Sequence, residues 1–155
     1  MKLSNLIEPD LLISDINTED PTEALKIMTE FLKEKDKISN SKEILKKLLD
    51  REKLASTSIG KNTAIPHAKI KDLKNPIIMI AMCKKGFVYN HGDKEPVNLL
   101  ILILSPSGSP ALHLQILAAA ASLIKKPGNL IGEMLKVKNS TDIFNLIKKF
   151  EEIND

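Results

Sequence analysis

The chain is poor in the residues on which many binding and redox sites depend. Its 155 residues include no tryptophan and one cysteine, and aromatic residues make up only 3% of the composition. A single cysteine excludes an internal disulfide and a cluster of thiolate metal ligands, so we expect Cys83, which lies in an apolar run, to be a small buried hydrophobe. Few aromatic rings and a net charge of only +3 argue against nucleic-acid binding.

The chain also lacks long hydrophobic runs. No apolar stretch approaches the length that crosses a bilayer, and residues 1–8 have no signal-peptide core, so we expect a cytoplasmic protein without membrane insertion. A hydrophobic content of 43% suffices for one core and is too little for two. The sequence therefore predicts a single domain over residues 1–155.

Capping residues mark the helices. Asp20 and Pro21 precede an apolar stripe, which is typical of an N-cap and the first helical position, and a second helix is predicted to begin near Asn40. Further helices are expected over residues 111–125, 130–135 and 140–150. The first of these three is apolar nearly all round, which predicts deep burial.

The middle of the chain has the pattern of buried strands. Short apolar runs bounded by glycine, proline or asparagine occupy residues 63–65, 77–83 and 97–104, and residues 86–88 are expected to form a short edge strand. Helices before and after a central sheet predict an α/β fold, with a mixed β-sheet flanked by helices.

His67 is the strongest candidate for the chemical centre. It directly follows Pro66, whose φ is fixed, and Ile65 before the proline is restricted to extended conformations. The backbone that carries the imidazole is therefore stiff. A stiffly presented imidazole suggests a nucleophile.

Two charged residues interrupt the apolar stripe of the second helix. At helical pitch, Glu52 falls near the middle of the stripe and Arg51 at its flank, so both must be paired or bind something. Arg51 is either the last charged residue of a helix or a guanidinium that faces a phosphoryl group, and the spacing favours the second interpretation. The hydroxyls of residues 56–58 are close enough to His67 in sequence to line the same pocket.

The other two histidines lie in different settings. His113 falls in the first turn of the helix over residues 111–125, where the helix dipole disfavours a charged imidazole and free N–H groups attract anions. It is either a neutral hydrogen-bond donor beside a phosphate or a histidine tucked into an apolar helix. His91, in a polar turn, is most simply a surface residue. No two histidines have the spacing of a zinc site, and no metal is expected.

Two catalytic classes are disfavoured by their missing motifs. The run around Gly60 lacks the Gly-Lys-Ser/Thr ending of a nucleotide-binding loop, so direct use of ATP is not expected. Ser107 and Ser109 lie between two prolines rather than at the strand-to-helix elbow of a serine hydrolase.

Four ordered segments carry a resemblance to a known family. They are Asp50-Arg51-Glu52-Lys53-Leu54, Ser58-Ile59-Gly60 leading to Ala64-Ile65-Pro66-His67, Pro96-Val97, and His113-Leu114-Gln115-Ile116-Leu117. With these segments the chain resembles the enzyme IIA domain of the fructose, mannitol and nitrogen-regulatory class of the bacterial phosphoenolpyruvate-dependent phosphotransferase system (PTS). The departures from the family pattern are Ala68, Asn62-Thr63 and His91, which bear on loop shape and partner choice.

The resemblance implies a phosphoryl relay without cofactor or metal. His67 would accept a phosphoryl group from an HPr-like phosphocarrier and pass it to an enzyme IIB component, while Arg51 and His113 would stabilise the phosphorylated site. A nitrogen-regulatory protein with the same phosphohistidine, which acts by binding other proteins, is the alternative. A binding module that works without phosphorylation would be expected to have lost one of these three residues. Sugar, phosphate acceptor and oligomeric state are left open.

Overall fold

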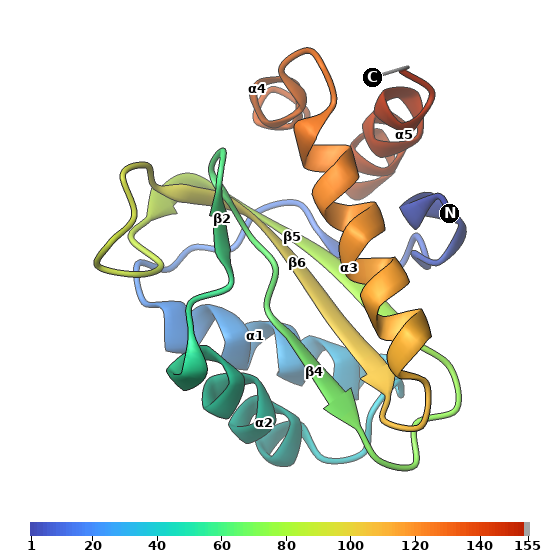
Figure 1. Cartoon of the computed structure of the whole chain (residues 1–155). Helices are drawn as coiled ribbons and strands as arrows, with labels where there is room; N and C mark the ends of the chain where they lie inside the picture. The colour runs from blue at the N-terminus through green and yellow to red at the C-terminus, as the bar shows by residue number, and fades with distance from the viewer. Residues whose placement is uncertain (154–155) are drawn as a thin grey trace.

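The computed structural model describes residues 1–153 as helices on both faces of one mixed β-sheet (Figure 1). The helices are α1 (Pro21–Glu34), α2 (Ser41–Leu54), α3 (Pro110–Lys125), α4 (Leu130–Met134) and α5 (Ser140–Glu151), preceded by a 3-10 turn, η1 (Leu3–Asn5). The strands are β1 (Leu12–Ile13), β2 (Ser58–Gly60), β3 (Thr63–Ala64), β4 (His67–Ile70), β5 (Ile77–Phe87) and β6 (Val97–Pro106). The predicted α/β fold with a mixed sheet is confirmed.

The sheet is built around the long antiparallel pair β5 and β6. Its order is β1-β5-β6-β3-β2, and β4 also pairs with β6. β3 and β4 join β6 in succession and both run parallel to it, while β1 runs parallel to β5. Ile65 and Pro66 link β3 to β4, so His67 is the first residue of β4. The carbonyl of Pro66 accepts a 2.9 Å hydrogen bond from the Ile103 amide, which anchors the backbone beside His67 to β6.

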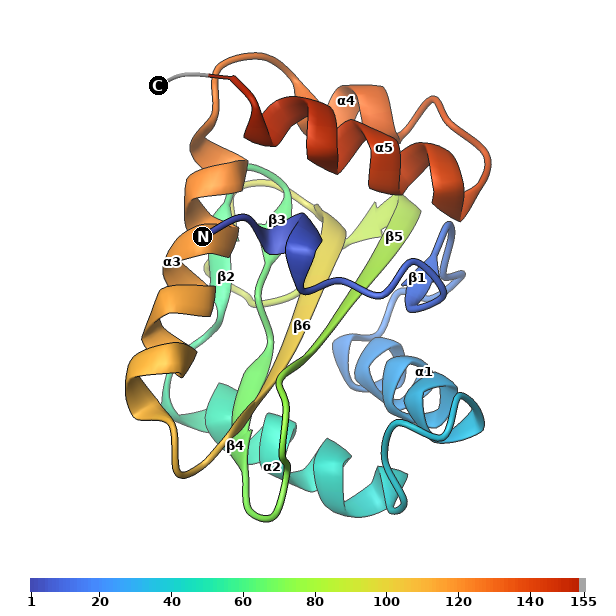
Figure 2. The same ribbon diagram turned by 90° about the vertical axis from the view of Figure 1, so that its right-hand side faces the viewer.

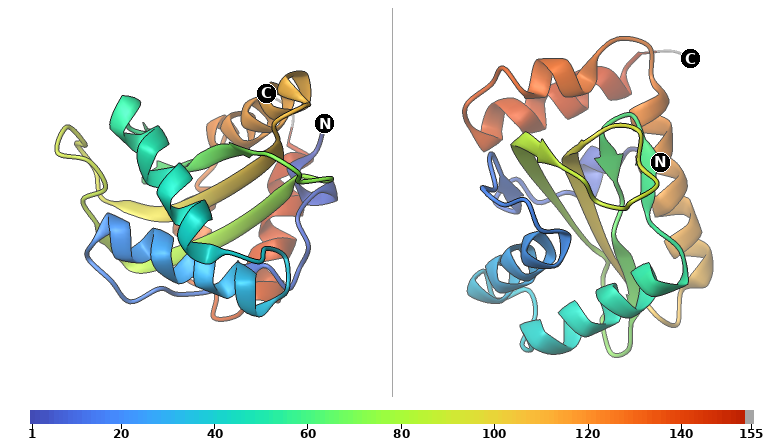
Figure 3. Two further views of the ribbon diagram at one scale, coloured as in Figure 1. Left: turned by 90° about the horizontal axis from the view of Figure 1, so that it is seen from below. Right: turned by 90° about the vertical axis from the view of Figure 1, so that its left-hand side faces the viewer.

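Side chains from alternate positions of β5 and β6 bury both faces of the sheet. Met79 and Leu102 belong to the core beneath α1 and α2, whereas Ile80 and Ile101 belong to the core beneath α3, α4, α5 and η1. Figures 2 and 3 show these two helical layers on opposite sides of the strands. Strands buried on both faces are apolar at nearly every position, which is why the sequence reveals them. Cys83 lies in the first core and is 1% exposed, as predicted.

The helices begin where their capping residues predict. The side chain of Asp20 accepts a hydrogen bond from the Thr22 amide at the start of α1, and Asn40 accepts one from the Glu43 amide at the start of α2. Within residues 1–153, none of the helices is long and apolar enough to cross a membrane.

Two expectations about individual elements are wrong. Residues 86–88 do not form a separate edge strand, because Gly86 and Phe87 are the end of β5 beyond a register shift after Met82. A φ of +74° at Gly86 accommodates this irregularity. The helix α3 is buried along one side only, and Leu114 on its outer side is 66% exposed. The deep burial predicted from the apolar composition of this helix is therefore wrong for its outer side.

Candidate functional site

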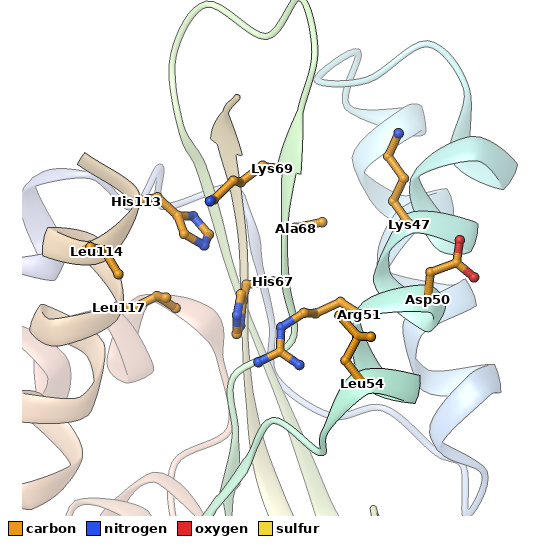
Figure 4. Close-up of a pocket in the computed structure, with 10 residues that line it drawn as sticks. All are labelled: Lys47, Asp50, Arg51, Leu54, His67, Ala68, Lys69, His113, Leu114 and Leu117. Atoms are coloured by element: carbon orange, nitrogen blue, oxygen red, sulfur yellow. The ribbon is translucent and has the colours of Figure 1, made fainter. Parts of the chain in front are cut away.

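A pocket of about 700 Å³ between α2, β4 and α3 brings together the predicted site residues Arg51, His67 and His113 (Figure 4). The remaining lining residues are Lys47, Asp50 and Leu54 from α2, Ala68 and Lys69 from β4, and Leu114 and Leu117 from α3. Two helices packed on opposite faces of the sheet thus reach the same place beside β4.

The ring of His67 is oriented by its own backbone. Its Nδ1 lies 2.7 Å from the carbonyl oxygen of Ile65. A carbonyl oxygen can only accept a hydrogen bond, so Nδ1 is the protonated nitrogen of the neutral ring and Nε2 carries the lone pair. The half-buried ring lines the pocket and therefore offers a nucleophilic nitrogen there.

His113 faces His67 from the first turns of α3. The centroids of the two imidazole rings are 5.4 Å apart, and the ring planes are inclined by 53°. The side chain of His113 is buried at 5% exposure, and its Nδ1 lies 2.7 Å from the hydroxyl oxygen of Ser105. The ring of His113 is thus buried in α3 and also borders the pocket, an arrangement compatible with both interpretations from the sequence.

Burial keeps both imidazoles neutral near pH 7. It lowers the pKa of His67, and the nearby positive charges of Arg51 and Lys69 lower it further, against the opposing effects of the Ile65 hydrogen bond and the Glu52 carboxylate. Burial also lowers the pKa of His113, and repulsion from a protonated His67 ring lowers it further. A neutral His67 retains the lone pair that a nucleophile requires.

Arg51 reaches the pocket from the last turn of α2. Its Nη1 donates a 2.8 Å hydrogen bond to the carbonyl of Ala55, and Figure 4 shows the guanidinium beside the His67 ring. The same view shows the amine of Lys69 extending toward His113. Over residues 1–153, neither cation forms an ion pair with a carboxylate. Their charges are therefore available to a bound anion.

Glu52, the neighbour of Arg51, is occupied by hydrogen bonds. Its carboxylate accepts from the Thr57 amide at 3.0 Å, from the Thr57 hydroxyl, and from the Tyr89 phenol at 2.7 Å. Burial raises the pKa of Tyr89, so the phenol remains a donor. The charge that interrupts the apolar stripe of α2 is thus paired, as the sequence requires, and it ties the end of α2 to the loop before β2.

The expectation that the hydroxyls of residues 56–58 line the histidine pocket is wrong. Thr57 turns toward Glu52, and the Ser56 hydroxyl accepts a 3.1 Å hydrogen bond from the Ser58 amide. Ser58 pairs with β3 and borders a different hollow, so closeness in sequence to His67 does not bring these side chains to the site. His91 is exposed, as predicted.

Several pocket residues were not singled out from the sequence. Leu54 and Leu114 flank the histidines from α2 and α3 and are 82% and 66% exposed. Lys47 and Lys69 add positive charge, and Ser105 contacts His113 from the end of β6. Only Ser105 has a signal in the sequence, a hydroxyl directly after the aliphatic run of residues 99–104. Exposed lysines and leucines are common on any surface.

The sequence and structure of this chain match one protein family. A family model described as "Phosphoenolpyruvate-dependent sugar phosphotransferase system, EIIA 2" matches residues 5–150. The chain belongs to this family. Family membership supports a phosphotransferase role for this PTS EIIA-type domain.

Its curated relatives include both sugar-specific and regulatory proteins. The chain is 30% identical over 125 residues to a nitrogen regulatory protein of Bradyrhizobium diazoefficiens, covering 81% of each sequence. It is 25% identical over 152 residues to the fructose-specific EIIABC component of Bacillus subtilis, covering 98% of this chain. It spans only 24% of the length of that second relative.

Solved EIIA structures share the fold. The nitrogen regulatory protein IIA-Ntr from Neisseria meningitidis superimposes with a TM-score of 0.83 at 18% identity, over 94% of this chain and 98% of its own. The IIA mannitol enzyme of Escherichia coli, in its complex with phosphorylated IIB mannitol, gives a TM-score of 0.77 at 17% identity, over 92% and 97% of the two chains. At these identities the similarity establishes the single-domain fold.

Proposed function

We propose that this EIIA domain carries a phosphoryl group on Nε2 of His67, accepts it from an HPr-like phosphocarrier and passes it to an enzyme IIB component. The observation that supports this assignment most strongly is the hydrogen bond from His67 Nδ1 to the Ile65 carbonyl. It leaves the lone pair on Nε2, in the pocket that Arg51 and His113 also line.

The transfer is an in-line displacement between two histidine rings. The Nε2 lone pair of His67 forms the new N–P bond while the N–P bond of the donor phosphohistidine breaks and its electron pair returns to the donor ring. The proton on Nδ1 of His67 stays in its hydrogen bond to Ile65, so no general base is needed. Transfer to the acceptor reverses these events, with a ring nitrogen or thiolate of the IIB component as the nucleophile.

Charge stabilisation is the main task of the surrounding residues. The transition state of phosphoryl transfer is loose and spreads negative charge over the three phosphoryl oxygens. The guanidinium of Arg51 neutralises this charge. The His113 ring lies close enough to His67 to donate a hydrogen bond to one of the phosphoryl oxygens. The amine of Lys69 adds positive charge at the same place.

The regulatory alternative uses the same site. The similarity to nitrogen regulatory proteins favours a second candidate function, in which phosphorylation of His67 controls the binding of other proteins and sugar uptake is not involved. The two candidates differ in whether phosphate leaves His67 for a sugar-specific IIB component. Our proposal retains the cytoplasmic location and the single EIIA domain over residues 1–155 that the sequence predicts.

The test is the intact mass of the protein after incubation with phosphoenolpyruvate, enzyme I and HPr. We expect one added phosphoryl group that acid removes, because phosphohistidine is acid-labile and phosphoserine is not. His67→Ala should abolish it, whereas His91→Ala, a change at an exposed histidine, should not. An unmodified wild-type protein, or a modified His67→Ala variant, would contradict the proposal. Subsequent addition of fructose- or mannitol-type IIB domains distinguishes relay from regulation by loss of the added mass.

A further inference from the structure

Ser105 is a buried polar residue at the end of the aliphatic run of β6. It lies near the end of β6, directly after a run of aliphatic residues, and is 0% exposed. In the sheet register it stands opposite Lys69 of β4. Its hydroxyl oxygen lies 2.7 Å from Nδ1 of His113.

The surroundings of Ser105 determine the direction of this hydrogen bond. Throughout residues 1–153, Nδ1 of His113 is the one hydrogen-bond partner of the Ser105 hydroxyl, and no buried side-chain nitrogen or oxygen is left without a partner. A hydroxyl can donate as well as accept, and its proton has no water to reach in a fully buried position. If Nδ1 of His113 donated instead, the hydroxyl proton would remain unpaired in the interior, which is costly.

We infer that Ser105 is a positioning residue, which donates its hydroxyl proton to Nδ1 of His113 and so holds this histidine as the tautomer with its proton on Nε2. The inference about the tautomer depends on the geometry alone. Its consequence for phosphoryl transfer rests on the proposed function of His67.

The two histidines are then held in opposite tautomers. The Ile65 carbonyl requires the proton of His67 on Nδ1 and leaves a lone pair on Nε2, whereas Ser105 places the proton of His113 on Nε2. One ring presents the nucleophile and the other presents a hydrogen-bond donor, 5.4 Å apart between centroids. With the other tautomer, His113 would present a lone pair to the phosphoryl oxygens and would repel them instead of binding them.

The first experiment is a long-range ¹H–¹⁵N NMR spectrum of the full-length, unphosphorylated protein at a pH well above the ordinary histidine pKa. The ¹⁵N shifts identify which nitrogen of each neutral ring is protonated. We expect His113 protonated on Nε2 and His67 on Nδ1. A proton on Nδ1 of His113 would overturn the inference, and this readout needs neither a partner protein nor a folded variant.

The second experiment compares Ser105→Ala with Ser105→Thr, which retains a hydroxyl, and with Ser107→Ala, a matched change on the exposed turn after β6. Loss of the hydrogen bond should slow phosphoryl transfer at saturating HPr about three- to tenfold in Ser105→Ala. It should also shift the His113 ¹⁵N signals toward a mixture of tautomers, which a purely structural role of Ser105 would not cause. Ser105→Thr should recover the wild-type tautomer, and Ser107→Ala should behave as wild type. A folded Ser105→Ala protein with the wild-type rate and spectrum would contradict the inference.

The outcomes separate this inference from the proposed function. If the wild-type protein accepts phosphate but His113 carries its proton on Nδ1, the inference fails and the relay stands. If the wild-type protein accepts no phosphate, the role of Ser105 in transfer fails with the relay, and the spectrum still decides the tautomer.

Discussion

The phenol of Tyr89 donates a 2.7 Å hydrogen bond to Oε1 of Glu52, and so joins the segment after β5 to the last turn of α2. The same turn carries Arg51, and the same carboxylate accepts from the amide of Thr57. This network fixes the backbone from which the guanidinium extends, although none of its side chains lines the histidine pocket.

We expect Tyr89→Phe to lower the free energy of unfolding by about 1–3 kcal/mol, because the part-buried carboxylate of Glu52 loses the hydrogen bond that the phenol donates to it. Urea unfolding followed by circular dichroism measures this loss. In a double-mutant cycle with Thr57→Val the two losses should be non-additive, since both hydroxyls donate to Glu52. Strict additivity would mean that the network does not act as a unit.

Arg51 offers a test of charge against geometry. Arg51→Ala should slow phosphoryl transfer about 10²-fold, because a charge-stabilising group is lost from the transition state. Arg51→Lys should recover part of the rate, since an ammonium supplies the charge without the planar fork that binds two oxygens. Rapid-quench transfer kinetics would measure both, with Lys47→Ala as a control for general loss of positive charge on the pocket rim. Equal rates for Arg51→Ala and Lys47→Ala would argue against a specific role.

The depressed pKa values predict the pH dependence of the reaction. Protonation of Nε2 destroys the nucleophile, so the transfer rate should stay level from neutral pH to below the ordinary histidine pKa of 6.5 and fall only in more acidic solution. Transfer from a fixed concentration of phosphorylated HPr, measured across this range, provides the profile. A decline already centred above pH 6.5 would contradict a neutral, buried His67.

The lowered pKa values of His67 and His113 also make the stability of the fold depend on pH. Because burial lowers the pKa values of His67 and His113, the unfolded chain binds more protons than the folded protein once the pH falls below 6.5. The contribution of these two histidines to the free energy of unfolding is therefore fully present above pH 6.5. It is lost as the pH falls from 6.5 toward their lowered pKa values in the folded protein. Urea midpoints of the wild-type protein should decrease more steeply over this acidic range than those of a His113→Gln variant.

Two glycines with similar backbone conformations should respond differently to substitution. Gly60 and Gly86 have φ values of +78° and +74°, so alanine is strained at both. A Cβ at Gly60 meets nothing within 4 Å, and Gly60→Ala should cost about 1 kcal/mol. A Cβ at Gly86 would lie 3.0 Å from the Asn98 side-chain nitrogen, which donates to the Cys83 carbonyl. Gly86→Ala should therefore cost more, about 2–4 kcal/mol of the free energy of unfolding. Denaturation curves of the two variants measure both losses, and equal losses would contradict this prediction.

The sequence predicts those parts of the fold whose signals are local. Asp20 and Asn40 cap α1 and α2 with their own neighbours, and β5 and β6 are apolar because both of their faces are buried. β1 and β4 escape prediction because they are short, and their pairing with β5 and β6 is a tertiary effect. No local pattern specifies such edge strands.

The same distinction between local sequence signals and tertiary contacts applies to the candidate site. His67 and Arg51 stand out because a proline and an interrupted helical stripe mark them in the sequence, and the structure brings them together with His113. The role of Ser105 is not evident from the sequence, because it depends on a contact between β6 and α3 that exists only in the folded structure. The hydroxyls of residues 56–58 show the converse error, since closeness along the chain led to an expected contact that the β2–β3 hairpin prevents.

The assembly of the pocket from α2, β4 and α3 has a consequence for protein synthesis. A nascent chain that has just left the ribosome tunnel as far as His67 lacks β6, on which β4 is aligned, and α3, which supplies His113. Under the proposed function, competence to accept phosphate therefore arises late, after α3 has been translated and packed on the sheet. Partner proteins would then encounter a phosphate acceptor only on chains in which β6 and α3 have been translated, so phosphorylation of His67 would itself report that this part of the fold has formed.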